Sequence, residues 1–127
     1  MKTGTVLIYS FLWSRQQVQG EDAGRKDRPV AVAFNFGHKI GLVPITSQAP
    51  RADERGIEIP EIEKQRAGLD ATKRLWLIPT EMNIDDPAHS YYLEPESVIG
   101  EFSSAFMEKL KAEIRLSIGQ VRQVTRR

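Results

Sequence analysis

The sequence predicts a mainly β protein of the α+β class: a small β-barrel or strongly curved sheet with short helical insertions and a C-terminal amphipathic helix packed on it. Two observations predict this class. Short apolar segments rich in β-branched and aromatic residues, separated by polar stretches with glycine or proline, fill the first eighty residues. One long segment with helical periodicity closes the chain. Strands and helix are therefore segregated rather than alternating.

Length and composition indicate a single domain over residues 1–127, which has 40% hydrophobic and 28% charged residues. The absence of cysteine excludes disulfides, thiolate zinc sites and a cysteine nucleophile, and two histidines exclude a histidine-rich metal site, so we expect no metal and no cofactor. No apolar run reaches the roughly 18–20 residues of a membrane span, and no small-residue cleavage site follows the apolar residues 6–13. We expect a cytoplasmic protein without a membrane segment.

The first half of the chain contains three predicted strands. Residues 4–13 are dense in apolar strand-forming side chains. Residues 14–27 are polar and show no periodicity, which predicts a long loop. Residues 29–36 and 39–46 are predicted to pair as a hairpin through a short glycine-containing turn. Because proline lacks an amide hydrogen, Pro44 predicts an edge position or a bulge in the third strand.

The second half contains shorter elements and then the helix. Residues 56–60 alternate like a short strand, and residues 60–67 suit a short helix with proline in its first turn and glycine after its end. Residues 75–78 read as a buried strand that extends to about Met82. From about Ser103 to the C-terminus the sequence predicts one helix. Its apolar stripe consists of Phe106, Leu110, Ile114, Ile118 and Val121.

Charge is distributed unevenly, although the net charge is only +1. Residues 1–48 hold six Lys/Arg against three Asp/Glu, residues 49–101 hold six against twelve, and residues 102–127 hold six against two. A nucleic-acid partner would therefore need a local patch on the first or the last segment. On charge alone, solvated surfaces are the favoured interpretation.

Two further groups of residues bear on chemistry. His38 and His89 could act as a base and acid pair in RNA cleavage, since imidazole titrates near neutrality, but both are expected in turns where polar residues are common. Glu81, Asp85 and Asp86 could bind a divalent cation, although a solvated turn is the more frequent role of such a run.

A phosphate site is predicted where the hairpin strands begin and end. Arg28 follows two other cations just before the second strand, and Thr46 begins a run of hydroxyl and amide side chains where the third strand ends. If the two strands pair, Arg28 and Thr46 lie at the same end of the hairpin. Arginine offers a planar fork of donors to a phosphate, and hydroxyl groups add hydrogen bonds. The alternative is a surface arginine beside an ordinary strand residue, and the residues alone leave both interpretations open.

These segments resemble the MazF/PemK family of bacterial toxins. Residues 4–9 (GTVLIY) are similar to the family's glycine-led first strand. Gly24 and the Arg28-Pro29 step into the apolar residues 30–32 are similar to its basic Arg-Pro step. Residues 44–48 (PITSQ) are similar to its Pro-x-Thr-[Thr/Ser]-Gln step. Order and spacing agree over roughly the first 50 residues.

The resemblance implies an SH3-like β-barrel, a homodimer, and a type II toxin that cleaves single-stranded RNA sequence-selectively and without metal. It implies an acidic, partly disordered antitoxin that blocks the RNA groove. The family's catalytic arginine and first hydroxyl residue fall on Arg28 and Thr46. The expected substrate-binding residues are Arg25, Lys26, Ser47 and Gln48.

Two alternatives use the same barrel. A protein-binding poison, like the toxins that bind DNA gyrase, would act through the C-terminal helix rather than through Arg28. A catalytically inactive relative would persist as a binding or regulatory module, which the acidic middle segment and Asp27 favour slightly.

Overall fold

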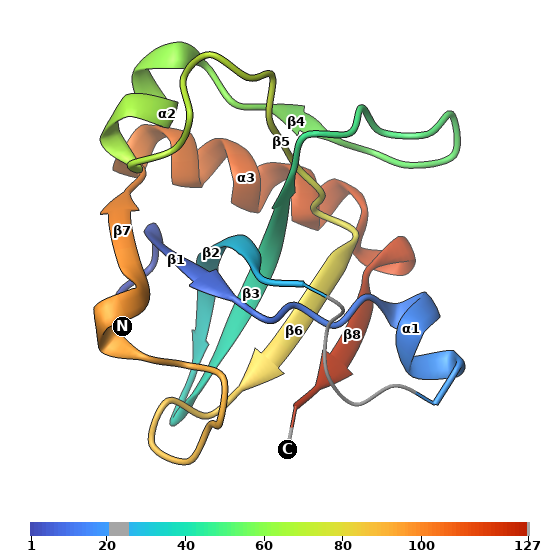
Figure 1. Cartoon of the computed structure of the whole chain (residues 1–127). Coiled ribbons are helices and arrows are strands. Elements are labelled where there is room, and N and C mark those ends of the chain that lie inside the picture. The colour runs from blue at the N-terminus through green and yellow to red at the C-terminus, as the bar shows by residue number, and fades with distance from the viewer. Residues whose placement is uncertain (21–25, 127) are drawn as a thin grey trace.

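The computed structural model of the chain describes residues 1–20 and 26–126, and these residues form eight strands, three α-helices and two short 3-10 helices (Figure 1). The strands are β1 (Thr5–Tyr9), β2 (Arg28–Phe36), β3 (Lys39–Thr46), β4 (Ile57–Glu58), β5 (Trp76–Leu77), β6 (Glu81–Asp85), β7 (Val98–Glu101) and β8 (Arg122–Thr125). The helices are α1 (Ser14–Val18), α2 (Glu61–Arg66) and α3 (Ser104–Leu116), with 3-10 turns η1 (Pro95–Ser97) and η2 (Ile118–Gln120).

Strand β3 is the centre of the sheet because it pairs with three other strands. On one side it forms the predicted hairpin with β2, and the sheet continues antiparallel through β1 to β7. On its other side β3 pairs with β6 near its start and with β5 at its end. β5 leads on to β4, and β6 leads on to β8, which runs parallel to it.

The mainly β, α+β class is confirmed, but the sheet is open. The strand order runs β4-β5-β3-β2-β1-β7, with β6 and β8 branching from β3. Within the described residues, no pairing joins β7 at one edge to β4 or β8 at the others, so the expected barrel is not closed. Among the helices of residues 1–20 and 26–126, none has the length and apolar character that a bilayer crossing requires.

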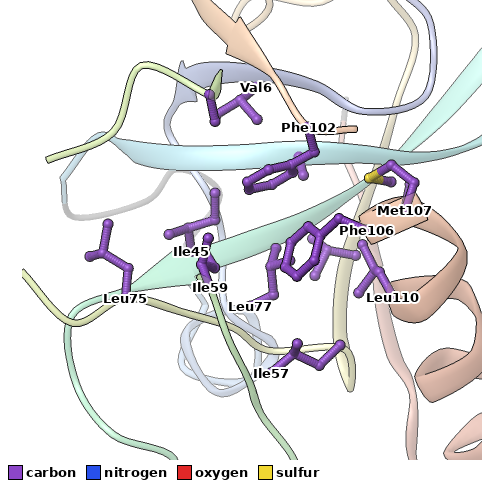
Figure 2. Packing of buried hydrophobic residues seen from close by; sticks show 14 of the residues in the cluster. Val6, Ile45, Ile57, Ile59, Leu75, Leu77, Phe102, Phe106, Met107 and Leu110 are labelled. Atoms are coloured by element: carbon purple, nitrogen blue, oxygen red, sulfur yellow. The ribbon is translucent and has the colours of Figure 1, made fainter. Parts of the chain in front are cut away.

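The sheet has an apolar cluster on each face, as the alternation of a strand predicts. Val43 and Ile45 of β3 belong to the cluster on the face that α3 covers, whereas Leu42 belongs to the other cluster. Figure 2 shows Phe106 and Leu110 of α3 within the first cluster. The second cluster is built around aromatic side chains of residues 9–13 and strands β2, β3 and β5.

Helix α3 begins as predicted and ends earlier. The Ser103 hydroxyl caps it by accepting a hydrogen bond from the Phe106 amide at 3.2 Å. The prediction that the helix continues beyond Leu116 was wrong. Ile118 is 70% exposed rather than part of an apolar stripe, and the chain turns through η2 into β8. Gly119 lies in this turn, and glycine disfavours a helix interior.

Other predictions on local structure also need correction. Residues 14–18, expected in a loop, form helix α1, which at five residues is too short to show periodicity in the sequence. The strand expected from residue 75 to Met82 is two strands, β5 and β6. Strand β7 was not predicted.

Pro44 lies in the central strand rather than at an edge. Its carbonyl accepts a hydrogen bond from the Ile78 amide at 3.1 Å, and in an extended strand the nitrogen of the same residue points to that side. The pairing of β3 with β6 ends at Leu42, and its pairing with β5 begins at Ile45. The missing proline donor therefore falls where β3 changes partners. It removes the reciprocal bond to the Ile78 carbonyl, which accepts a hydrogen bond from the Glu81 amide at 3.3 Å instead.

Candidate functional site

The hairpin brings Arg28 and Thr46 to one end of the sheet. Val30 pairs with Pro44, and continuing this antiparallel register outward by two residues sets Arg28 opposite Thr46. Both residues lie on the sheet face that carries the second, aromatic cluster, because Val30 and Val32 belong to it. The sequence-predicted proximity of the two side chains is thus confirmed in the fold.

Arg28 and Thr46 line a pocket of about 400 Å³, together with three other predicted residues, Lys26, Ser47 and Gln48. Lys26, Ser47 and Gln48 are exposed. Arg25, also expected to bind substrate, lies outside the described residues.

The hydroxyl of Thr46 is oriented by its own turn. Its Oγ1 accepts a hydrogen bond from the Gln48 amide at 3.1 Å. This contact uses one of the oxygen's two acceptor positions and leaves the hydroxyl hydrogen free to donate. Thr46 can therefore donate to a phosphate oxygen in the pocket while its position is held by the chain that follows it.

Arg28 is packed against an aromatic ring, and within the described residues it forms no ion pair with a carboxylate. Its guanidinium carbon lies 5.0 Å from the centroid of the Trp13 ring, a cation–π distance. Its Nε is buried and donates to no group in the part of the chain that the structure describes. Burial lowers the pKa of the Arg28 guanidinium below its usual value, and the positive charge of Arg15 lowers this pKa further. The site is thus strongly electropositive and half-desolvated.

Trp13 and Arg15 were not identified from the sequence as site residues. Both line the pocket, and the guanidinium carbon of Arg15 lies 4.8 Å from the centroid of the Trp13 ring. Trp13 lies between β1 and α1 and Arg15 lies in α1, and both are more than ten residues from Arg28 in the sequence. Trp13 is an apolar residue at the end of the strand predicted over residues 4–13, so the sequence around it does not indicate that it lines a site.

Two alternate side chains of β6 hold the backbone around Trp13 against the sheet. The Glu81 carboxylate accepts hydrogen bonds from the Ser14 amide at 2.9 Å and from its hydroxyl at 2.7 Å. The Asn83 side chain accepts from the Leu12 amide at 2.8 Å and donates to the Leu12 carbonyl at 2.7 Å. Asp85 continues this row one step further. The row therefore fixes the backbone on both sides of Trp13.

Asp85 lies at the buried end of the row. Its Oδ2 accepts hydrogen bonds from the Tyr9 hydroxyl at 2.8 Å and from the Ser90 hydroxyl at 2.7 Å. Arg126 reaches the same cluster, with its guanidinium carbon 5.4 Å from the Tyr9 ring centroid. Burial raises the pKa of the Tyr9 phenol above its usual value; Arg126 opposes this rise, and Asp85 adds to it.

The sequence left open a divalent-cation site at Glu81, Asp85 and Asp86, and the described residues do not form one. Glu81 and Asp85 are buried and accept hydrogen bonds from protein groups, as described above. Within residues 1–20 and 26–126, no three His, Cys, Asp or Glu side chains come together as metal ligands would. The sequence signal for this role as buried hydrogen-bond acceptors is the alternation of Glu81, Asn83 and Asp85 along one strand.

The two histidines lie at the opposite end of the hairpin from Arg28. His38 is in the turn between β2 and β3, and His89 Nδ1 is 3.0 Å from Asp86 Oδ2 on an exposed loop. The His89 contact lowers the pKa of the Asp86 carboxyl, and the charge of His38 lowers it to a smaller extent. The two histidines are therefore separate from the pocket at Arg28.

A second pocket, of about 550 Å³, adjoins the first. The two pockets share Arg15, Arg51 and Glu54, and the second extends toward Arg122 at the start of β8. Glu54 is the acidic residue common to both, and its carboxylate accepts a hydrogen bond from the Arg51 amide at 3.3 Å. The second pocket is lined by three arginines and also by three acidic residues, Asp53, Glu54 and Glu81, so positive charge is concentrated in the first pocket.

No protein-family model matches this chain, and no curated protein sequence matches it.

Proposed function

We propose that the chain is a toxin of a type II toxin–antitoxin system, related to the MazF/PemK family, and that it cleaves single-stranded RNA sequence-selectively without metal. One observation carries the proposal: Arg28 and Thr46 lie at the same end of the β2–β3 hairpin and line one pocket with Lys26, Ser47 and Gln48. A fixed guanidinium beside a hydroxyl donor suits a phosphodiester. The four Lys and Arg side chains that line this pocket, against the single carboxylate of Glu54, suit a phosphate-bearing strand.

The reaction proposed is an internal transesterification. The ribose 2′-oxygen attacks phosphorus, a 2′-O–P bond forms, and the P–O5′ bond breaks. The proton lost by the 2′-hydroxyl is balanced by the proton gained by the 5′-oxygen, so that the products are a 2′,3′-cyclic phosphate and a 5′-hydroxyl.

The side chains act mainly by charge stabilisation in this reaction. The phosphorane is doubly charged, and a preorganised cation and hydrogen-bond donor stabilise it more than they stabilise the substrate. Arg28 supplies the cation and Thr46 the donor. Arginine is a poor general base because its pKa exceeds about 12, so Arg28 is assigned charge stabilisation and protonation of the leaving oxygen.

The remaining parts of the proposal follow from the resemblance. The open, branched sheet is proposed to correspond to the family's SH3-like barrel, and the functional unit is proposed to be a cytoplasmic homodimer. An acidic antitoxin segment is the proposed inhibitor, because the pockets carry arginines that would attract it. Part of the acidic segment 49–101 lies away from these pockets: Glu58, for example, pairs with Arg74 at 2.8 Å on the surface.

Induced expression in a bacterial host tests the proposal. We expect growth arrest from the wild-type chain and none from Arg28→Ala or Thr46→Val at equal soluble protein levels. Arg74→Ala is the matched control, because Arg74 also stacks on a tryptophan but lies outside the pockets. Equal arrest by Arg28→Ala and the wild type would contradict the assignment.

A further inference from the structure

Arg15 and Arg28 share one aromatic ring. Their guanidinium carbons lie 4.8 Å and 5.0 Å from the centroid of Trp13. Two cations over one indole repel each other, and the ring quadrupole offsets only part of this repulsion. No ion pair joins either arginine to a carboxylate within residues 1–20 and 26–126.

Arg74 provides a comparison within the same chain. Its guanidinium carbon lies 4.9 Å from the centroid of Trp76, which is nearly the same stacking distance. Arg74 also donates two hydrogen bonds to Glu58, at 2.9 Å and 2.8 Å, and this partner raises the pKa of its guanidinium. The stack at Trp13 has a second arginine where the stack at Trp76 has a carboxylate. Among the described residues neither arginine at Trp13 forms an ion pair, so a bound anion would supply the counter-charge.

We propose that Arg15 joins Arg28 in binding a single phosphate group, and that Trp13 is the positioning residue that holds the two guanidiniums around a site for a dianion. Both arginines line the same pocket as Thr46. Two cations held on one ring attract a dianion more strongly than a monoanion. The identity of the dianion rests on the proposed function: an RNA phosphodiester carries one charge, and its phosphorane carries two.

The position of Arg15 gives it a distinct role in turnover. Arg15 is exposed and lines both pockets, whereas Arg28 is half-buried. The attraction between a neighbouring cation and the phosphate increases when the charge on the phosphate rises from one to two. The loss of Arg15 should therefore lower kcat about a hundredfold and change KM little, because its contact strengthens in the transition state.

Binding of inorganic phosphate tests the site without any RNA. The chain has two tryptophans, so Trp76→Phe leaves Trp13 as the only indole reporter. In that background at pH 8 and constant ionic strength, phosphate dianion should change Trp13 fluorescence saturably and bind more tightly than the monoanion dimethyl phosphate. Arg15→Gln should weaken phosphate binding about tenfold, as for one charge-assisted hydrogen bond, and remove most of the preference for the dianion.

The control and the kinetic arm make the outcomes separable. Arg74→Gln should leave phosphate binding unchanged, and far-UV circular dichroism should confirm that each variant is folded. No saturable response, equal affinity in Arg15→Gln, or an equal loss in Arg74→Gln would overturn the dianion site. Phosphate binding that depends on Arg15 in a protein that leaves RNA intact would instead uphold the site and contradict the proposed nuclease.

Discussion

Glu81 and Ser14 are joined by two hydrogen bonds that connect the centre of the sheet to the start of α1. The Ser14 amide and hydroxyl both donate to the same carboxylate, at 2.9 Å and 2.7 Å. Glu81 is 7% exposed, so this contact is shielded from water. Because Trp13 precedes Ser14 and Arg15 follows it, the pair fixes the backbone beside the tryptophan and beside Arg15.

Replacing Glu81 by alanine should lower the free energy of unfolding by about 1–3 kcal/mol, because two partly buried donors on Ser14 lose their acceptor. Urea denaturation followed by circular dichroism measures this. Glu108→Ala is the control, since Glu108 is on the exposed surface of α3 and its oxygen lies 4.0 Å from the Lys111 nitrogen. That change should stay within about 0.5 kcal/mol. Equal effects of the two variants would show that the Ser14 contact contributes nothing.

Arg28 is expected to serve function at no benefit to stability. Its Nε is buried without a described partner, and Arg15 repels it. Arg28→Met keeps a similar length and removes the charge, so the free energy of unfolding should stay within about 1 kcal/mol of wild type or rise. Thermal and urea unfolding measure this change. A loss of about 3 kcal/mol would mean that the guanidinium is a structural group.

Stability should fall at alkaline pH because of Tyr9. Burial raises the pKa of this phenol in the folded protein, so the unfolded chain loses its proton first, above about pH 10. The stabilisation that Tyr9 contributes is fully present below about pH 10 and is lost progressively as the pH rises from there toward the pKa of the folded protein. Tyr9→Phe should cost about 1–3 kcal/mol at pH 7 through the lost Asp85 contact and should flatten the alkaline decline. Tyr91 is 87% exposed, so Tyr91→Phe should change neither the stability at pH 7 nor its decline at alkaline pH.

The observed end of α3 also gives a prediction. Leu110 is fully buried and Leu116 is 71% exposed, although both belong to the same helix. Leu110→Ala should lower the free energy of unfolding by about 2–5 kcal/mol, and Leu116→Ala should change it by less than about 0.5 kcal/mol. Chemical denaturation of both variants tests this difference. Similar losses would indicate that the surface near Leu116 is covered in solution.

The sequence was sufficient for features that depend on local patterns. The glycine turn and the two apolar runs predicted the β2–β3 hairpin, and that hairpin sets Arg28 opposite Thr46. The spacing of Phe106, Leu110 and Ile114 predicted the buried face of α3.

Features that depend on contacts between distant segments could not be predicted. Trp13 meets Arg28 because β6 holds the preceding segment in place, and nothing in the sequence near Trp13 encodes that contact. The prediction of a helix beyond Leu116 was wrong for another reason. Ile118 continues the four-residue spacing of α3, but Gly119 and the open edge of β6 favour a strand, and the residues that follow pair with that edge as β8.

Cleavage of RNA by the purified protein in EDTA tests the central claim most directly. A long single-stranded RNA should yield discrete fragments with 5′-hydroxyl and 2′,3′-cyclic phosphate ends with the wild-type protein and with the Arg74→Ala control. Arg28→Ala should be slower by about a hundred- to a thousandfold, the typical loss for one preorganised electrostatic group. Intact RNA after incubation with the folded wild-type protein, or equal cleavage by Arg28→Ala, would contradict the account.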